Sequence, residues 1–213
     1  MLAFAVIIAL EHVLLPRLGP TDHMISEYVT AGGLASVLAV GALAAWSVSF
    51  LAAALLSACP ASRGRATRIL TVCLGLACVG LAVTAVFPTQ AVGGVVPSGV
   101  ERTLAGQLHD LGGSLAQITI FAAALLSVWA APWSSRLRAA AVILVAVALI
   151  LGPALTVLDV DARGLRQRGL VAMACAWEMG LVITLAQGAG ETPRRSAHKR
   201  RSVRGSHAAR KAS

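Results

Sequence analysis

The side chains that could do chemistry in this chain stand between long apolar blocks, and most of them are histidines, arginines and carboxylates. Imidazole and carboxyl groups can transfer protons, and guanidinium groups bind anions through paired N–H donors. Ionisable groups at membrane depth are costly, so those that occur usually face a bundle interior or a cavity. The side chains that we predict to bind a ligand are His12, Asp22, Ser26, Glu27, His109, Asp110, Arg166, Arg168 and Glu178.

Three kinds of reactive site could be built from this set. Ser26 could act as a nucleophile with His109 as its base, and Asp22 or Asp110 could orient the imidazole. His12 and His109 could instead hold a zinc ion together with a carboxylate, or ligate a haem from both sides. The chain has no nucleophile-elbow or HExxH motif to support such chemistry. We therefore assign no catalytic residue and predict no metal and no cofactor.

Several of these residues also have a purely structural interpretation. His109 could hydrogen-bond a neighbouring helix and hold the bundle together. Glu178 lies about 15 Å into the last apolar block, where a carboxylate must be either protonated or paired. It is therefore either a structural hydrogen-bond partner or a proton or cation site. Ser26 and Asp22 could cap the second helix, because serine and aspartate are favoured at helix N-termini.

The apolar blocks that separate these residues predict membrane-spanning helices. Hydrophobic residues make up 57% of the chain and charged residues 13%, whereas a soluble domain carries about a quarter charged residues. A helix needs about 20 apolar residues to cross the hydrocarbon core of a bilayer. We therefore predict an all-α transmembrane bundle of about six spans. Their approximate ranges are Leu2–Leu15, Tyr28–Leu56, Ile69–Phe87, Thr103–Ala131, Leu137–Leu158 and Arg168–Gln187.

Small residues inside these spans favour close contacts between helices, because they let two backbones approach. Cysteine behaves there as a small apolar residue, and the four cysteines form no CxxC pair and no zinc spacing. We predict no disulfide and no cysteine metal site. The glycines that we expect at close helix contacts are Gly32, Gly33, Gly41, Gly75, Gly80, Gly112 and Gly113.

Arginine and lysine residues in the short loops predict the orientation of the bundle. Basic residues gather in the loop after the second span, the loop after the fourth span and the segment after the sixth. The loop after the fifth span does not fit this distribution of charge, since it combines arginines with aspartates. The majority places both termini in the cytoplasm of a cell and the multi-pass chain in the cell membrane. Most of the predicted ligand-binding residues then lie on the extracytoplasmic side.

The C-terminal segment differs from the rest of the chain in charge. Residues 191–213 hold eight basic residues and one acid, whereas residues 1–190 hold ten basic and eight acidic residues. A segment with so little to bury predicts a disordered cytoplasmic tail behind a transmembrane domain of residues 1–190. Basic segments next to a membrane span bind anionic lipid. We expect the lipid bilayer and anionic lipid as partners, and no nucleic acid.

Short segments at the ends of the predicted spans resemble those of a known family. They are Glu11–His12 with Pro16–Arg17, Ile25–Tyr28, Phe87–Thr89, Gly106–Gly113 and Gly164–Arg168. In their order and placement they are similar to the bacterial and archaeal six-span family called Domain of Unknown Function 998, over the whole chain except its tail. The Ile25–Glu27 and His109–Gly113 segments are also similar, more weakly, to eukaryotic DRAM-type six-span proteins. The resemblance implies a six-span membrane fold and no activity.

These observations favour a membrane protein that binds a ligand on its extracytoplasmic side. The polar cluster there would bind a lipid headgroup, a small anion or protons. The alternatives are an intramembrane hydrolase that modifies a lipid, and a structural or accessory subunit whose polar cluster serves assembly. A nucleophile and its base, or two ligands of one metal, must lie within about 3–4 Å of each other. The partners of His12, Ser26, His109 and Arg168 therefore discriminate between these functions.

Overall fold

The computed structural model is an all-α bundle, as the sequence predicts, and it describes residues 2–58, 64–131, 133–157 and 162–210. A short 3-10 helix, η1, lies between the first two α-helices. The elements are α1 Leu2–Leu14, η1 Ile25–Thr30, α2 Gly33–Ser57, α3 Arg65–Val86, α4 Leu104–Ala130, α5 Ser135–Val157 and α6 Arg163–Arg210.

The helices are apolar and long enough for a multi-pass membrane protein. Among the described residues, α2, α3, α4 and the Arg163–Gln187 part of α6 are each long and apolar enough to cross a bilayer. Two shorter apolar stretches, Phe4–Leu14 and Arg138–Ala148, fall in α1 and α5. Four full-length spans and two shorter apolar helices agree approximately with the predicted six.

The second helix begins later than the sequence predicts. Residues 25–30 form the separate helix η1, and α2 begins only at Gly33. The break between them is made by Gly32 and Gly33, whose φ angles of 80° and 59° lie in the left-handed region that glycine tolerates. Gly32 is the N-cap of α2, and no side chain caps the helix. The interpretation of Ser26 or Asp22 as the cap of this helix is therefore wrong.

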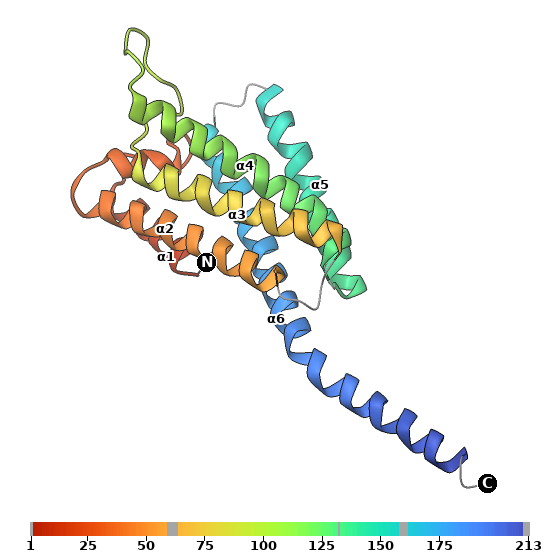
Figure 1. Cartoon of the computed structure of the whole chain (residues 1–213). Helices are drawn as coiled ribbons and strands as arrows, with labels where there is room; N and C mark the ends of the chain where they lie inside the picture. The colour runs from red at the N-terminus through yellow and green to blue at the C-terminus, as the bar shows by residue number, and fades with distance from the viewer. Residues whose placement is uncertain (1, 59–63, 132, 158–161, 211–213) are drawn as a thin grey trace.

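Helix α3 lies between α2 and α4 in the bundle (Figure 1). Helix α3 packs against both α2 and α4, α1 lies along α2, and α5 contacts α4 and α6. Beyond Gln187, α6 leaves the bundle and projects from it as a helix that ends at Arg210 (Figure 1). The prediction that residues 191–213 form a disordered tail on anionic lipid stays a prediction.

The tightest helix crossing joins α3 to α4 through two glycines. A Cβ atom on Gly80 would lie 2.6 Å from the backbone nitrogen of Ala116 and 2.7 Å from the carbonyl oxygen of Gly112. A Cβ atom on Gly112 would lie 2.9 Å from the carbonyl oxygen of Gly80 and 2.8 Å from Cγ1 of Val83. The predicted role of glycine in close helix contacts is thus confirmed for this pair, whereas nothing lies within 4 Å of the position of a Cβ on Gly75.

This contrast predicts opposite effects for two similar substitutions in α3. We expect Gly80→Ala to lower the free energy of unfolding by about 1–3 kcal/mol, because the added methyl group forces two backbones apart. Gly75→Ala should be neutral or stabilising by up to about 1 kcal/mol, since alanine is the better helix former. Denaturant unfolding of both variants in detergent measures the difference. Equal stabilities would contradict the close crossing.

Candidate functional site

The polar groups of the bundle gather at one end, where α1 ends, α6 begins and α3 joins α4; we call this the polar end. Arg168 is at its centre. Its Nε–H donates to Nε2 of His12 at 3.2 Å, and its Nη1 donates to the carbonyl oxygens of Pro20 at 2.9 Å and His23 at 2.6 Å. Its Nη2 donates to the hydroxyl of Tyr28 at 3.3 Å. Four of the five N–H donors of the guanidinium are therefore engaged.

The protons of this cluster can be assigned from its donors. Arginine only donates, so Nε2 of His12 must be an acceptor and the imidazole is neutral with its proton on Nδ1. That Nδ1–H donates to the Tyr28 oxygen at 2.6 Å, and Tyr28 donates to the carbonyl oxygen of Leu18 at 3.1 Å. Burial raises the pKa of the Tyr28 hydroxyl, and the nearby Arg168 guanidinium opposes part of that rise. The hydroxyl is therefore a neutral donor.

The first turn of α6 holds the same segment through its backbone. The N–H groups of Gly164 and Leu165 both donate to the carbonyl oxygen of Thr21, at 2.8 and 3.2 Å. The first N–H groups of a helix have no partner inside it, and a backbone carbonyl satisfies them here. The contact requires a glycine, because a Cβ on residue 164 would collide with the carbonyl oxygens of His23 and Pro20.

Glu27 joins η1 to the loop between α3 and α4. Its Oε1 accepts from the backbone N–H groups of Met24 at 3.0 Å and Gly94 at 2.9 Å. Its Oε2 accepts from Nδ1 of His23 at 2.7 Å and from the N–H of Gly93 at 3.0 Å. The two glycines have positive φ angles, which aim successive N–H groups at one anion. All four bonds of this carboxylate end on the protein itself.

These bonds outweigh the effect of burial on Glu27. Burial by itself raises the pKa of the carboxyl, because it disfavours the charged form. The hydrogen bonds from His23 and from the three backbone N–H groups act in the opposite direction and hold the pKa below its usual value. Glu27 is therefore an ionised structural group rather than a free ligand for a cation.

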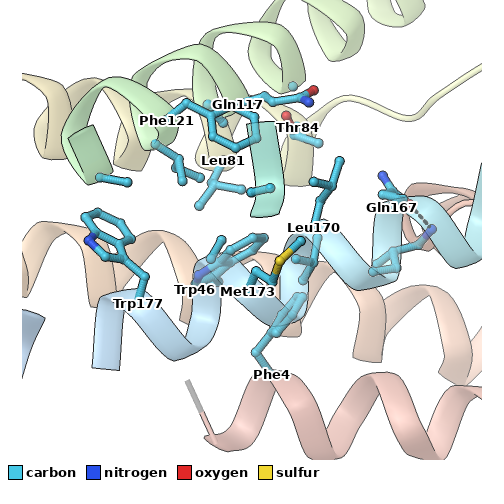
Figure 2. A pocket seen from close by; sticks show the side chains of 18 of the residues that line it. Phe4, Trp46, Leu81, Thr84, Gln117, Phe121, Gln167, Leu170, Met173 and Trp177 are labelled. Carbon is cyan, nitrogen blue, oxygen red and sulfur yellow. Dashed lines mark hydrogen bonds between the residues drawn. The ribbon is translucent and has the colours of Figure 1, made fainter. Parts of the chain in front are cut away.

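Below the polar end lies a cavity of about 170 Å³ inside the bundle. All seven helices contribute to its lining, which is mostly aliphatic and aromatic, and none of the described lining residues is ionisable. Its polar groups come from Ser26, Thr84, Gln117 and Gln167. Gln167 lies toward one end of the cavity and Trp177 toward the other (Figure 2). The ten residue steps from Gln167 to Trp177 correspond to about 15 Å along α6.

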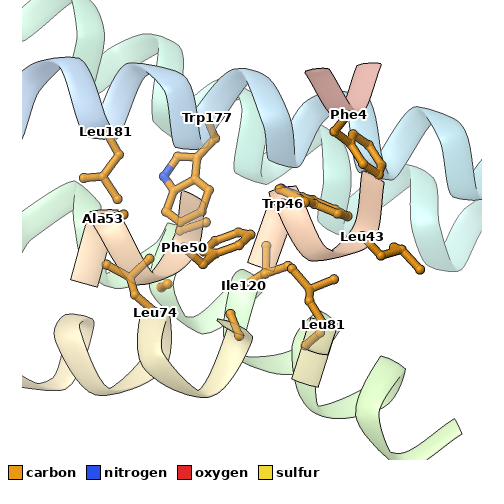
Figure 3. Packing of buried hydrophobic residues seen from close by; sticks show 14 of the residues in the cluster. Phe4, Leu43, Trp46, Phe50, Ala53, Leu74, Leu81, Ile120, Trp177 and Leu181 are labelled. Atoms are coloured by element: carbon orange, nitrogen blue, oxygen red, sulfur yellow. The ribbon is translucent and has the colours of Figure 1, made fainter. Parts of the chain in front are cut away.

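A row of aromatic rings lies along the cavity, of which Phe4, Trp46 and Trp177 belong to its lining. The centroids of Phe4 and Trp46 are 4.7 Å apart, those of Trp46 and Phe50 are 5.9 Å apart, and those of Phe50 and Trp177 are 6.4 Å apart. Figure 3 shows these rings between α1, α2 and α6, with Leu74 and Leu81 of α3 below them. Such tilted stacks bury large apolar surfaces.

Glu178 lies beside these rings, fully buried in α6. Its Oε2 accepts from the indole N–H of Trp46 at 2.9 Å, and its Oε1 lies 2.7 Å from Oγ of Ser49. Ser49 has one proton and is also 2.7 Å from the carbonyl oxygen of Trp46, which can only accept. The Ser49 hydroxyl donates to Glu178 and shares its proton with the Trp46 carbonyl oxygen. Both carboxyl oxygens of Glu178 therefore have a hydrogen-bond donor inside the bundle.

The four hydrogen bonds of Arg168 do not include the remaining predicted residues. His109 is buried, and its Nδ1 donates to the carbonyl oxygen of Phe87 at 2.7 Å. Asp110 is exposed and pairs with Arg102 at 3.3 Å. Asp22 is exposed on the segment before η1, and Arg166 is half-buried in the first turn of α6.

The structure therefore brings some of the predicted residues together and separates others. It joins His12 to Arg168 and places Ser26 at the cavity, but His109 has a different partner on another loop. Ser26 makes no hydrogen bond to a base in the described part of the chain. Both nitrogens of His12 are occupied, by Arg168 and by Tyr28. The described contacts therefore form neither the Ser26–His109 pair nor a shared contact of His12 and His109.

The comparison with protein families agrees with the helical architecture. The family model described as "Protein of unknown function (DUF998)" matches residues 1–184, which is most of the chain. The chain belongs to the DUF998 family. No curated protein and no solved structure matches it. The family is defined by its sequence and carries no assigned activity, so a function for this DUF998 protein must come from its site.

The segments that resemble DUF998 proteins meet in two places at the polar end. His12, Tyr28, Gly164 and Arg168 come from three of these segments and form the Arg168 cluster. The Phe87 and His109 segments form the second contact. The short motifs of this DUF998 chain therefore supply the contacts that hold its loops and helix ends together.

Sequence reasoning missed several residues of the polar end. Tyr28 and Gln167 appeared only as members of motifs, and Glu11 only as the neighbour of His12. The pair Gly93–Gly94 carried a usable signal, because two glycines between valines are typical of a two-residue hairpin turn. Val92 and Val95 indeed pair across that turn as an isolated antiparallel bridge. No local sequence pattern indicates that Glu27 accepts hydrogen bonds from the Gly93–Gly94 turn.

Proposed function

We propose that this DUF998 protein binds a membrane lipid that has an apolar chain and an uncharged, hydrogen-bonding head. The observation that carries the proposal is the cavity, which is apolar over most of its lining and polar at Ser26 and Gln167. Ligand sites are usually concave and apolar, with a few polar groups that fix orientation. A lipid whose apolar chain lies against Trp46 and Trp177 would place its polar head beside Ser26 and Gln167.

The polar groups of the cavity are suited to a neutral head. Oε1 of Gln167 accepts from the backbone N–H of Ile25 at 2.7 Å, which leaves its amide N–H groups as donors. Ser26 and the Gln117 side chain make no hydrogen bonds within the described residues and can each donate or accept. Hydroxyl and amide groups match a hydroxyl, ester or carbonyl group, whereas a phosphate would bring a charge with no cation beside it.

The charged groups of the polar end support the same choice. Arg168 has one N–H left after its four hydrogen bonds, and Glu27 accepts four. Binding an anion bidentately at Arg168 would require it to abandon protein partners. A lipid with a neutral head leaves these bonds intact, so we favour it over a small anion or a charged headgroup.

Photo-crosslinking tests this proposal. The probe is a monoacylglycerol with a diazirine in its chain, added to the purified protein in nanodiscs, and adducts are located by peptide mass spectrometry. We expect adducts on cavity residues such as Trp46 and Met173. Ala174→Trp, which fills the cavity, should reduce them at least fivefold. Ala172→Trp on the exposed face of the same helix is the matched control and should leave them unchanged.

The head of the lipid is tested by competition and by one substitution. Unlabelled monoacylglycerol should displace the probe, and phosphatidylglycerol at the same concentration should not. Ser26→Ala should weaken the binding about two- to tenfold, the value of one neutral hydrogen bond. Adducts that persist in a folded Ala174→Trp variant, or that spread over lipid-facing residues, would refute a cavity ligand. Displacement by phosphatidylglycerol alone would refute the neutral head.

A further inference from the structure

The most unusual side chain of the bundle is Glu11. It lies on the buried face of α1 with Phe4 and Ile8, it is 0% exposed, and neither carboxyl oxygen has a hydrogen-bond partner. Within the described part of the chain, no other buried side-chain polar atoms are left without a partner. An ionised carboxylate in such a place would be far more costly than the neutral acid. The surroundings of Glu11 in the structure therefore suit its protonated form.

One cation faces Glu11 from across the helix interface. Arg168 of α6 interacts with it electrostatically, yet the two form no ion pair within 4.0 Å. The other titratable groups near it are Tyr28 of η1 and the adjacent His12, while α2, which also packs on α1, has no ionisable residue. Glu27 lies beyond Tyr28 and is bound by its own partners. Arg168 is thus the available counter-charge.

The present partners of Arg168 are replaceable. Its Nη1 holds the carbonyl oxygens of Pro20 and His23, which are neutral acceptors, and its Nε–H already contacts the residue next to Glu11. A carboxylate binds a guanidinium more strongly than a carbonyl does, because both partners are charged and two parallel bonds can form. An ionised Glu11 would therefore compete for Nη1.

We propose that Glu11 is a proton-binding site, and that loss of its proton draws the Arg168 guanidinium from the carbonyl oxygens of Pro20 and His23. The step is a simple dissociation, in which the carboxylic acid becomes a carboxylate and the proton passes to water at the polar end. Arg168 keeps its charge throughout. The buried charge on Glu11 is compensated by Arg168 in one state and removed by the proton in the other.

This exchange would loosen the segment of residues 19–24, which directly precedes Ile25 and Ser26 in the cavity lining. Arg168 and the first turn of α6 hold that segment, and Ser26 and Gln167 follow directly beside it. Proton loss would then open the polar end of the cavity, and proton binding would close it. The consequence for a ligand depends on the lipid-binding function proposed above, whereas the proton site and the release of Arg168 do not.

Infrared spectroscopy tests the proton site directly. A protonated carboxylic acid has its own carbonyl stretching band, which we would follow in nanodiscs as the pH is raised from about 6, where exposed carboxyl groups are already ionised. We expect part of this band to titrate in the wild type and to be absent in Glu11→Gln. Glu178→Gln is the matched control, because Glu178 is equally buried but has partners, and it should keep the titrating part. A titrating band that survives in Glu11→Gln would overturn the proposal.

Hydrogen–deuterium exchange tests the release of Arg168. We expect the protection of the amides of residues 21–25 and of Gly164, corrected for intrinsic exchange, to fall at least tenfold in the wild type as the pH rises. Glu11→Gln, which mimics the protonated acid, should stay protected at every pH, while Glu11→Asp should respond with a shifted midpoint. Protection that is independent of pH in the wild type, or identical in all three proteins, would overturn the release.

The two proposals can fail separately. If the monoacylglycerol probe labels no cavity residue at any pH, lipid binding is refuted, and the spectroscopic and exchange results still decide the role of Glu11. If the probe labels the cavity of the wild type and of Glu11→Gln equally across the same pH range, the cavity binds lipid and its coupling to Glu11 is refuted.

Discussion

Replacing Glu27 with alanine is expected to lower the free energy of unfolding by on the order of 3 kcal/mol, because it removes hydrogen bonds to a charged group from four donors at once. The donors are His23 and the N–H groups of Met24, Gly93 and Gly94. Water can reach part of the glycine turn and replace some of these bonds. We therefore expect the loss of stability to be smaller than the sum of four hydrogen bonds. Denaturant unfolding in detergent measures the loss.

The same carboxylate predicts a dependence of stability on pH. The folded protein holds the pKa of Glu27 below its ordinary value of 4.5, so the unfolded chain takes up a proton first as the pH falls. The contribution of Glu27 is complete above that value and is lost as the pH falls through the lower pKa of the folded state. The difference in unfolding free energy between wild type and Glu27→Ala should therefore shrink below about pH 4.5.

Asp22→Ala is the control for both effects. Asp22 carries the same charge five residues earlier in the chain, but it is exposed. Its removal should change the stability by no more than about 0.5 kcal/mol. Glu27 does not join η1 to the glycine turn if Asp22→Ala and Glu27→Ala are equally stable. The same conclusion follows if the difference in unfolding free energy between Glu27→Ala and the wild type is equal at pH 4 and pH 7.

The spans could be predicted from the sequence because each one depends on its own composition. Long uncharged blocks specify helices wherever they occur, so α3 and α4 agree with their predicted ranges within a few residues. The start of α2 could not be predicted in this way, since Gly32 and Gly33 are apolar enough to continue a span. Their left-handed backbone depends on the packing of η1, which brings in residues from other helices.

The polar end was predictable in composition but not in pairing. Arg168 and His12 were both predicted to be site residues, yet 155 residues separate them and nothing local indicates that they meet. Glu11 illustrates the same difficulty. Its burial follows from the face of α1 that it shares with Phe4 and Ile8. Its lack of a partner depends on α6, because Arg168 donates to backbone carbonyl oxygens of the segment before η1 instead.

The close contact of α6 with that segment leads to the second large effect. Gly164→Ala is expected to lower the free energy of unfolding by about 3 kcal/mol, the upper end of the cost of overpacking. A Cβ there would collide with the His23 carbonyl oxygen and lie 2.6 Å from the Pro20 oxygen and 2.8 Å from Nη1 of Arg168. Both oxygens belong to rigid backbone, so the first turn of α6 must move away and weaken the bonds of Arg168.

Gly169→Ala separates this effect from a general effect of alanine in α6. Nothing lies within 4 Å of the position that a Cβ on Gly169 would occupy, and the residue is exposed five positions further along the same helix. It should be neutral or stabilising by up to about 1 kcal/mol. Hydrogen exchange adds a local measurement, since only Gly164→Ala should expose the amide of Leu165, which donates to Thr21. A Gly164→Ala protein as stable as Gly169→Ala, with its Leu165 amide protected, would mean that α6 does not hold this segment.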